Sequence, residues 1–586
     1  MNNFIQKGKK IITSPQSSIL SAATLIMMTI VASKILGFIR QRVLFSYFAP
    51  KQTDLLLAAF DVPDIMFEVL VFGVVSAAFI PIFSGYITKK KEEDGWHMAS
   101  SSINITLVIY LIFASIAFLF LNPIYTILAG QQVKNMLGIS GGYSPEDITL
   151  VVNISRVLLF SQIFFVISSF TTGVLESYRR FLMPALAPLV YNISIILGII
   201  FLSGQFGLFG VAIGAVVGAL FHFLVQIPVA AHLGFHPKLV WDLQDKGVRK
   251  LYKLSLPRVF ELSILQVRRF VWLFLGSIVT GGLTYLKSGD LLQTLPISVF
   301  GMSLAKAALP TLSLQASDND MKSFRQTFFT TLNQILFLVV PLSVFMIVLR
   351  VPIVRLVFGA SQFDWEATLE TGKVLSAFSV GMFAYAGSLL ITRAFYALQD
   401  TKTPVAISVF SMVLNALLAF YLILYCNTGI WGIALSYASA GIFQFCFLIL
   451  IIVKRIESNI KFFLIPFLKI SLASIFSGGA IYALIKVVDR ASWVNESSFL
   501  GKLDTQGIMI EQIVVDTRYA GNLFFLTAFV SLVGFGIYIL LLILFRSQEV
   551  WSFFNFARRI MTKNIAPIPS KEREQVTPLP TDSSSN

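Results

Sequence analysis

Charged side chains lie inside long apolar stretches of this sequence, where each of them needs an opposite charge, a bound anion or water beside it. An ionisable group near the centre of a bilayer costs roughly 2.5–3.5 kcal/mol on insertion scales. Arginine offers a phosphate forked hydrogen bonds, and lysine offers a point charge. The residues that predict a cavity for a phosphorylated head group are Lys34, Arg40, Asp54, Asp61, Arg268, Arg269, Asp290 and Lys306.

Internal ion pairing is the alternative explanation for the same residues. Asp61 or Glu68 could pair with Arg268 or Lys306 and so hold two parts of the protein together. Lys287 lies close to an expected helix end, where a lysine can simply extend its amine toward water. The sequence leaves both explanations open.

The residue types give little support to catalysis or to metal binding. Cys426 and Cys446 make no disulfide framework and are expected to be packing residues. Asp290 is a conceivable base, but its cationic neighbours favour pairing. We therefore expect no enzymatic reaction, no metal and no cofactor. Four histidines lack metal-ligand spacing: His97, His222, His232 and His236.

The elements that position these charges are membrane-spanning helices. Hydrophobic residues make up 56% of the 586 residues, charged residues 13%, and the mean hydropathy is +0.79. Apolar runs of about 20 residues, enough to cross a bilayer, recur along the chain, whereas a β-barrel would show short alternating segments. The first run, 19–38, is too long for a signal peptide. We predict about 14 helices, at 18–47, 53–86, 97–128, 147–176, 184–203, 206–233, 250–279, 283–313, 322–350, 370–398, 404–425, 428–453, 462–488 and 518–546.

The distribution of positive charge predicts that both termini face the cytoplasm. The loops after even-numbered helices carry the Lys and Arg residues, which usually stay on the cytoplasmic side. Arg40, Arg42 and Lys51, near the first external loop, are the exception. The formal charge of +15 therefore reflects membrane topology and does not indicate nucleic-acid binding.

An internal repeat predicts two related halves with the same membrane orientation. A small-residue pattern at Gly207, Gly210 and Gly214 recurs 222 residues later at Gly429, Gly432 and Ser436. Phe72-Gly73 recurs as Phe300-Gly301, and a looser match relates the Tyr178 and Tyr396 regions. Halves of this kind are related by an axis along the membrane normal, with the substrate site between them and alternating access as the mechanism. The sequence shows neither a ring of charged residues nor a filter motif, so it does not predict a channel.

These patterns predict an all-α polytopic membrane protein of two pseudo-symmetric six-helix lobes plus a C-terminal helix pair. The predicted segments are a cytoplasmic N-terminus at 1–17, lobes at 18–233 and 250–453 joined by a linker at 234–249, the helix pair at 462–546 with an external loop at 489–517, and a cytoplasmic tail at 547–586 that is disordered from about 566.

Four segments resemble the MurJ (MviN) family of the multidrug/oligosaccharidyl-lipid/polysaccharide (MOP) exporter superfamily, whose folds are MATE-like. Ser33–Arg40 is similar to the S-R-x-L-G-F-x-R signature of the first helix, and Thr53–Pro81 to the second helix. Leu309–Ser313 is similar to the eighth helix. The most specific match is Arg393–Pro404, which is close to R-A-F-Y-A-L-x-D-T-x-T-P.

The resemblance implies a flippase that moves lipid II, the undecaprenyl-diphosphate-linked peptidoglycan precursor, across a bacterial cell membrane. It implies a V-shaped cavity with a portal between helices one and eight, and a tail groove leading to the last two helices. Of the head-group residues, Lys34, Arg40 and Asp54 match the family most closely. The expected partners are lipid II and the bilayer, with possible cell-wall synthesis proteins; the chain is expected to be a monomer.

Several positions depart from the family pattern. The family usually has Lys at the position of Asp61, Arg-Arg at Phe67-Glu68, Arg at Leu291 and Glu at Thr294. Four cavity cations are therefore missing, and two positions reverse their charge. Three cations stand where the family tends to be uncharged, so we hypothesise that the cationic site has moved to Arg268, Arg269 and Lys306.

Three other functions remain open at this point. The chain could export another lipid-linked oligosaccharide or a small molecule, an option that the missing cations favour. A membrane enzyme would need a carboxylate or a histidine at the membrane face, often with a metal-binding pair. A non-transporting scaffold for cell-wall assembly is the third alternative. The sequence determines neither the energy source nor the head-group variant.

Overall fold

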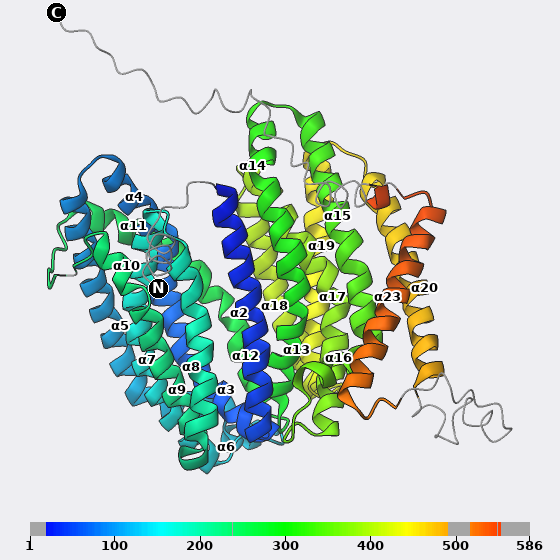
Figure 1. Cartoon of the computed structure of the whole chain (residues 1–586), viewed down its shortest axis with the longest axis horizontal. Helices are drawn as coiled ribbons and strands as arrows, with labels where there is room; N and C mark the ends of the chain where they lie inside the picture. The colour runs from blue at the N-terminus through cyan, green and yellow to red at the C-terminus, as the bar shows by residue number, and fades with distance from the viewer. Residues whose placement is uncertain (1–18, 237, 490–515, 548, 552–586) are drawn as a thin grey trace, which may run out of the picture.

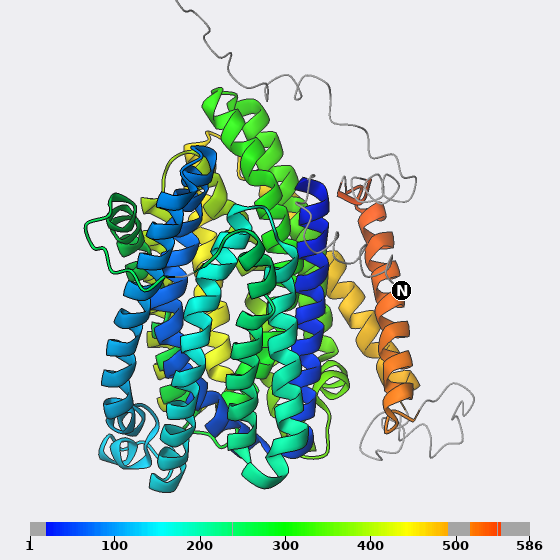
Figure 2. The same ribbon diagram turned by 60° about the vertical axis from the view of Figure 1, so that its left-hand side comes forward.

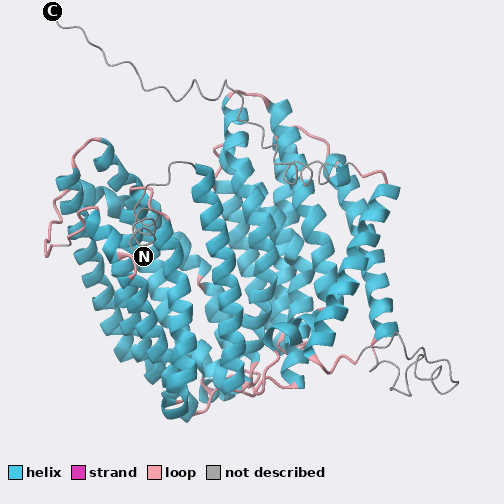
Figure 3. Ribbon diagram, in the orientation of Figure 1, coloured by secondary structure: helices cyan, strands magenta, loops and turns pink. Residues whose placement is uncertain are grey.

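The computed structural model describes residues 19–236, 238–489, 516–547 and 549–551 of the chain. These residues form helices joined by short loops, and no β-strand occurs among them (Figure 3). The predicted N-terminal segment 1–17, most of the predicted external loop 489–517 and the predicted tail beyond 551 lie outside the described residues.

The first half of the chain contains helices from α2 to α10. Its elements are α2 (Ile19–Tyr47), α3 (Pro50–Phe67), the π-helical segments η1 (Glu68–Phe72) and η2 (Val75–Phe79), α4 (Ile80–Thr88), α5 (Glu92–Ala129), α6 (Gln131–Met136), α7 (Pro145–Ser177), α8 (Leu182–Phe206), α9 (Leu208–Leu224) and α10 (Ile227–His232).

The second half and the C-terminal pair follow the same helical pattern. Their elements are α11 (Lys246–Leu265), α12 (Val267–Gly276), α13 (Gly282–Pro296), η3 (Ile297–Met302), α14 (Ser303–Ser317), α15 (Met321–Val348), α16 (Arg350–Phe358), α17 (Trp365–Ala397), α18 (Lys402–Leu424), α19 (Trp431–Arg455), α20 (Lys461–Val488) and α23 (Ala520–Leu544).

The prediction of a polytopic all-helical membrane protein is confirmed. Among the described residues, 11 helices are long and apolar enough to cross a membrane. The remaining predicted spans correspond to α2, to the interrupted stretch from α3 to α4, and to α11 with α12. The total of 14 spans stays a prediction.

The helices form two bundles with a helix pair on one flank. In Figure 1, α4, α5 and α7 to α11 lie on the left, α13 to α19 lie to the right of α2, and α20 and α23 form the right edge. Turning the molecule keeps α20 and α23 on the outside (Figure 2). Tyr538 of α23 donates to the Phe337 carbonyl of α15 at 2.8 Å, so the C-terminal pair is attached to the second half.

Helix α11 belongs to the second half by sequence but packs against the first half. A Cβ atom added to Gly73 would lie 3.2 Å from Leu262 and 3.5 Å from Val259, both on α11. The helix bundles therefore do not divide at the linker between the two halves of the sequence. The predicted lobe boundaries stay predictions.

The backbone itself carries the repeat that the sequence indicates. Left-handed turn residues recur at similar spacing in the two halves, 229, 220, 222 and 223 residues apart, in the pairs Lys90 and Asn319, Arg179 and Gln399, Gly207 and Gly429, and Gly234 and Glu457. Segments η1 and η3 also interrupt equivalent helices at Phe72 and Phe300. The second helix of each half is thus locally widened, a distortion that is frequent at functional sites.

The motif at Arg393–Pro404 forms the turn between α17 and α18. The Asp400 carboxylate accepts hydrogen bonds from the Thr403 backbone N–H at 3.1 Å and from the Thr403 hydroxyl at 2.8 Å. It also pairs with Arg455 at 2.8 Å. The hydrogen bonds from Thr403 and the charge of Arg455 lower the pKa of Asp400. The motif thus joins α17, α18 and the end of α19 in one turn.

Small residues let α8 and α9 pack with their backbones in contact. A Cβ atom on Gly198 would lie 2.7 Å from Cα of Gly214 and 2.9 Å from the Gly210 carbonyl oxygen. Close approach of this kind is typical of small residues spaced four apart in membrane helices. The repeated glycine pattern of the sequence therefore serves helix packing.

We expect Gly198→Ala to destabilise the first half, because the added methyl group must push the α9 backbone away. Overpacking of this kind costs about 1–3 kcal/mol. Gly204 lies on the same helix with open space around its Cβ position. Gly204→Ala should therefore leave stability unchanged or raise it by up to about 1 kcal/mol. Thermal unfolding of the purified variants in detergent measures both effects, and equal melting temperatures would contradict the packing role.

Candidate functional site

Three acidic residues form a stripe along α3 and η1. Asp54, Asp61 and Glu68 are spaced seven residues apart, so their side chains leave the same face of the helix. At 1.5 Å per residue the stripe is about 21 Å long, which is more than half of a hydrocarbon core. We refer to these three residues as the acidic stripe.

Two members of the acidic stripe bind α13 of the second half. The Asp54 carboxylate accepts a hydrogen bond from the Thr284 backbone N–H at 2.6 Å. The Asp61 carboxylate pairs with Lys287 Nζ at 2.6 Å, and the same amine donates to the Leu57 carbonyl at 3.0 Å. Asp61 is buried, with a side chain 6% exposed, so its charge depends on this partner.

The third member of the stripe binds α12. Glu68 pairs with Arg269 at 2.5 Å, and its other oxygen accepts from Gln266 Nε2 at 2.9 Å. Each acid of the stripe thus has a partner from the second half. Because separation would leave charges in an apolar environment, these contacts favour a conformation in which the halves are joined.

A chamber of about 720 Å³ adjoins the acidic stripe. Its charged lining residues are Arg40 of α2, Asp64 of α3, Glu68 of η1 and Lys287 of α13, two cations and two carboxylates. Gln162 Nε2 of α7 donates to Asp64 at 3.1 Å. The chamber therefore offers both signs of charge in the first half, with Lys287 as its one charged lining residue from the second half. Its other lining residues are Gln41, Leu44, Leu56, Leu57, Phe60, Phe67, Phe165, Tyr191, Ile195, Ile199, Val211 and Leu262.

Two predicted site residues on α2 lie in separate places. Arg40 lines the chamber, as the prediction of a cavity cation requires. Lys34 instead lines a smaller pocket of about 380 Å³, together with Glu176 of α7 and Pro184 of α8. The first helix therefore has charged groups in two cavities along its length.

The predicted cations of the second half do not form one cluster, although Asp290 lies close enough to Arg268 to act on it electrostatically. The Arg268 guanidinium lies over the rings of Trp272 and Tyr437, 4.8 and 5.3 Å from their centres. Asp290 accepts from Gln293 Nε2 at 2.9 Å on its own helix. Lys306 is exposed on α14. A cationic cluster of Arg268, Arg269 and Lys306 does not form in this conformation.

The ion pairs use different partners from those that the sequence favoured. Asp61 and Glu68 pair with Lys287 and Arg269, and neither pairs with Arg268 or Lys306 in the part of the chain described. Lys287, which the sequence also allowed to extend toward water at a helix end, directs its amine to Asp61 and keeps 25% of its side chain exposed. The seven-residue spacing of the acids was visible in the sequence, but their partners were not.

The halves also meet at the end of the molecule that carries the start of α3. The Arg42 guanidinium donates to the Leu356 carbonyl at 2.5 Å, and the Gln362 N–H donates to the Phe45 carbonyl at 3.1 Å. Lys134 of α6, which sequence reasoning did not single out, is fully buried and donates to the Ser277 hydroxyl after α12. In Figure 1, α3 and α6 lie toward the lower end of the molecule, so these contacts, with Asp54 near the start of α3, close that end.

The described residues contain no group of three or more His, Cys, Asp or Glu side chains that could hold a metal ion. The chamber can instead bind a ligand that has anionic groups for Arg40 and Lys287 and hydrogen-bonding groups for Asp64 and Gln162.

Comparison with known proteins gives a consistent result. The sequence profile of the family described as lipid II flippase MurJ matches residues 44–503. A probable lipid II flippase MurJ of Buchnera aphidicola subsp. Baizongia pistaciae is 26% identical over 412 residues, 70% of this chain and 78% of the relative. A protein of the same name from Borreliella burgdorferi is 24% identical, covering 80% of this chain and 90% of the relative.

Solved structures share the fold. A lipid II flippase MurJ in an inward closed conformation matches with a TM-score of 0.68 and 24% identity, over 89% of this chain and 99% of the other. An inward-facing multidrug resistance MATE family transporter of the MOP superfamily matches with a TM-score of 0.59 and 14% identity, over 72% and 94%. The all-helical, MATE-like membrane fold that the family resemblance implied is therefore confirmed.

We expect Asp61→Asn to destabilise the joined halves by about 3 kcal/mol, because Lys287 then keeps a charge without its carboxylate. The exchanged pair Asp61→Lys with Lys287→Asp should recover much of the loss. Lys373→Met is the matched control, since its pair with Glu370 is half exposed and such surface pairs contribute about 0–1 kcal/mol. Thermal unfolding and distance measurements between spin labels on the two halves test this, and an exchanged pair as unstable as Asp61→Asn would refute the direct interaction.

Proposed function

Because this chain belongs to the lipid II flippase MurJ family, we propose that it carries lipid II, the undecaprenyl-diphosphate-linked peptidoglycan precursor, from the cytoplasmic to the outer leaflet by alternating access. The chain is a multi-pass membrane protein. The single observation that best supports transport is a chamber that holds two cations and two carboxylates and lies beside the ion pairs that join the two halves.

In this mechanism, the head group enters the chamber while the polyprenyl tail stays in the lipid. The diphosphate would bind Arg40 first, because the described residues give this guanidinium no carboxylate within ion-pair distance while it lines the chamber. Asp64 would then accept hydrogen bonds from the uncharged part of the head group, and the amide N–H of Gln162 would donate to it.

The acidic stripe would act as the gate. Lys287 and Arg269 can exchange their carboxylate partners for phosphate oxygens, since both anions match the same cations. That exchange would lower the cost of separating the halves, because the cations stay paired throughout. Binding of the head group would thus shift the population toward a conformation in which the side closed by the stripe opens.

The predicted topology gives the direction of transport. Both termini are proposed to face the cytoplasm of a bacterial cell, since the basic loops lie on that side. The side closed by the acidic stripe then faces outward. We propose that the chain acts as a monomer, with the tail of the substrate following the lipid-facing surface toward α20 and α23.

A second candidate substrate is another lipid-linked oligosaccharide. The observation that favours it is the equal number of cations and carboxylates in the chamber lining, which makes the site less cationic than the family pattern implies. Translocation of labelled undecaprenyl-diphosphate substrates in proteoliposomes separates the two. Formation of a reaction product by the purified protein would instead support an enzymatic function. Absence of transport, with assembly of the cell-wall synthesis proteins retained, would support a scaffold.

We expect Arg40→Ala to reduce translocation of lipid II at least about 10-fold, because a charge-assisted hydrogen bond contributes about 1.5–3 kcal/mol. The measurement is complementation of a flippase-depleted host, with the accessibility of the head group scored on each face of the membrane. Lys454→Ala, an exposed site distant from the chamber lining, is the control and should complement fully.

The double variant Arg268→Ala with Arg269→Ala tests the second-half cations in the same host. Loss of Arg269 leaves Glu68 without its cation, so we expect weakened complementation. Full activity of this double variant would reject a role for helix α12 in holding the head group, and full activity of Arg40→Ala would reject the chamber as the site of passage.

A further inference from the structure

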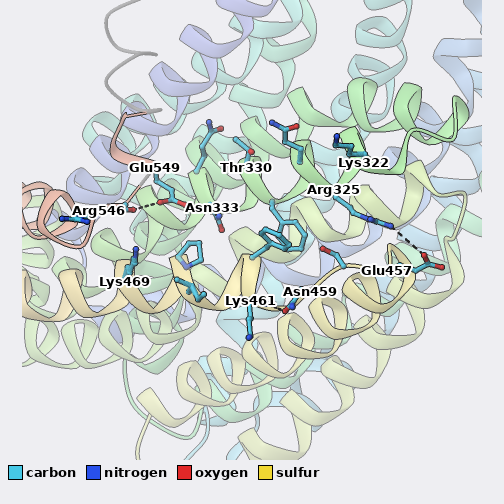
Figure 4. A pocket seen from close by; sticks show the side chains of 18 residues that line it. Lys322, Arg325, Thr330, Asn333, Glu457, Asn459, Lys461, Lys469, Arg546 and Glu549 are labelled. Atoms are coloured by element: carbon cyan, nitrogen blue, oxygen red, sulfur yellow. Dashed lines mark hydrogen bonds and ion pairs between the residues drawn. The ribbon is translucent and has the colours of Figure 1, made fainter.

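A second cavity, larger than the chamber, lies on the opposite flank of the second half. It measures about 810 Å³ and lies between α15, α20 and the residues that follow α23 (Figure 4). None of its lining residues lines the chamber, and the helices that form it are different from those around the chamber. The mechanism proposed above uses none of its lining residues to hold the head group.

The flank cavity is strongly cationic. Five basic residues line it against two carboxylates, Glu457 and Glu549, which gives a formal charge of +3. Arg325 approaches Glu457 at 4.0 Å, but that carboxylate is 88% exposed and binds weakly. For the other four cations, the described residues place no carboxylate within 4 Å. These four are Lys322, Lys461, Lys469 and Arg546.

A polar stripe on α15 lines the same cavity. Lys322, Gln326, Thr330 and Gln334 recur every four residues, so they share one face of the helix over its first four turns. Asn333 is buried, and its amide oxygen has no hydrogen-bond partner, while its nitrogen donates to Glu549 at 3.2 Å. The stripe and this unpaired oxygen therefore offer hydrogen-bonding groups to a polar ligand.

The wall formed by α20 combines cations with apolar side chains. Lys461, Ile465 and Lys469 follow one another at four-residue spacing along this wall, and Phe462 and Pro466 lie between them. Beyond the cavity, α20 exposes further apolar side chains to the membrane, among them Leu468, Leu472 and Phe476. An occupant with a charged head and long apolar chains fits this surface, whereas a free anion would leave the apolar wall uncovered.

We propose that the flank cavity binds the phosphate head group of an anionic phospholipid of the cytoplasmic leaflet. The lysines of α20 and Arg546 would hold the phosphate oxygens, the amides of α15 would bind the glycerol and ester groups, and the acyl chains would lie along α20. Basic pockets between helices at the cytoplasmic surface are suited to such head groups. The formal charge matches a head group with two phosphates better than one with a single phosphate.

This site goes beyond the proposed flippase function and does not depend on it. Only the leaflet rests on the orientation proposed above. The bound lipid would add to the direct contacts of α15 with α20 and with the end of α23, which include the packing of Phe329 against Phe462, with ring centres 5.9 Å apart, and the hydrogen bond from Asn333 to Glu549.

Native mass spectrometry of the full-length protein, released from nanodiscs that contain equal amounts of cardiolipin and phosphatidylethanolamine, tests the proposal. We expect the wild type to retain cardiolipin selectively. Lys461→Gln with Lys469→Gln should lower retention at least about 10-fold, because each basic residue near an anionic membrane contributes about 1 kcal/mol. The matched control, Lys89→Gln with Lys91→Gln, removes two exposed lysines outside the cavity and should retain lipid as the wild type does.

Photocrosslinking of the wild type keeps the test independent of variant folding. An anionic phospholipid with a photoreactive acyl chain should label the α20 segment around Phe462 and Ile465, and a zwitterionic analogue should not. Equal labelling by both lipids, or unchanged retention in the cavity variant, would overturn the proposal. Displacement of the bound lipid by undecaprenyl diphosphate, or by inorganic phosphate alone, would assign the site to the substrate or to a free anion and would also overturn it. Translocation assays are not part of the readout, so a failed flippase function leaves this test unaffected.

Discussion

The structure depends on how buried charge is neutralised across the two halves of the molecule. Asp54, Asp61 and Glu68 would each be costly inside a membrane protein if they stood alone. Each instead meets a backbone N–H or a cation from α12 or α13. The same requirement that makes these residues expensive makes the association of the halves specific, since each acid has its own partner on α12 or α13. A reversible version of this pairing is what an alternating-access gate requires.

The chamber adjoins that arrangement. Residues 40–211 of the first half supply 15 of its 17 lining residues, and Leu262 and Lys287 of the second half complete it, so the cavity lies in the first half beside the junction. The reversal of charge relative to the family pattern is also explained here: an acid at position 61 or 68 is accommodated because Lys287 or Arg269 stands opposite. The positive charge is instead distributed between the two halves. The predicted cluster of free cations on α12 and α14 does not form in the joined conformation.

The two cavities differ in physical character. The chamber contains equal numbers of cations and carboxylates among its lining residues, which suits an exchange of partners during transport. The flank cavity has an excess of positive charge beside an apolar helix face, which suits a resident amphipathic ligand. One protein thus presents a charge-balanced chamber beside the junction of its halves and a cavity with an excess of positive charge at its periphery.

The sequence by itself determined the helical membrane fold, the repeat and the family, because hydropathy and turn chemistry are local properties. Turn residues such as Arg179 and Gln399 recur in the backbone as the repeat indicates. The sequence also singled out Arg40 and the acids of the second helix, since charge in an apolar run is conspicuous. Only the tertiary structure decided that Lys287 and Arg269 are the partners, that Lys34 lies in another pocket and that Lys306 is exposed. Those outcomes depend on which faces of distant helices meet, and a widened π-segment such as η1 or η3 rotates every face that follows it.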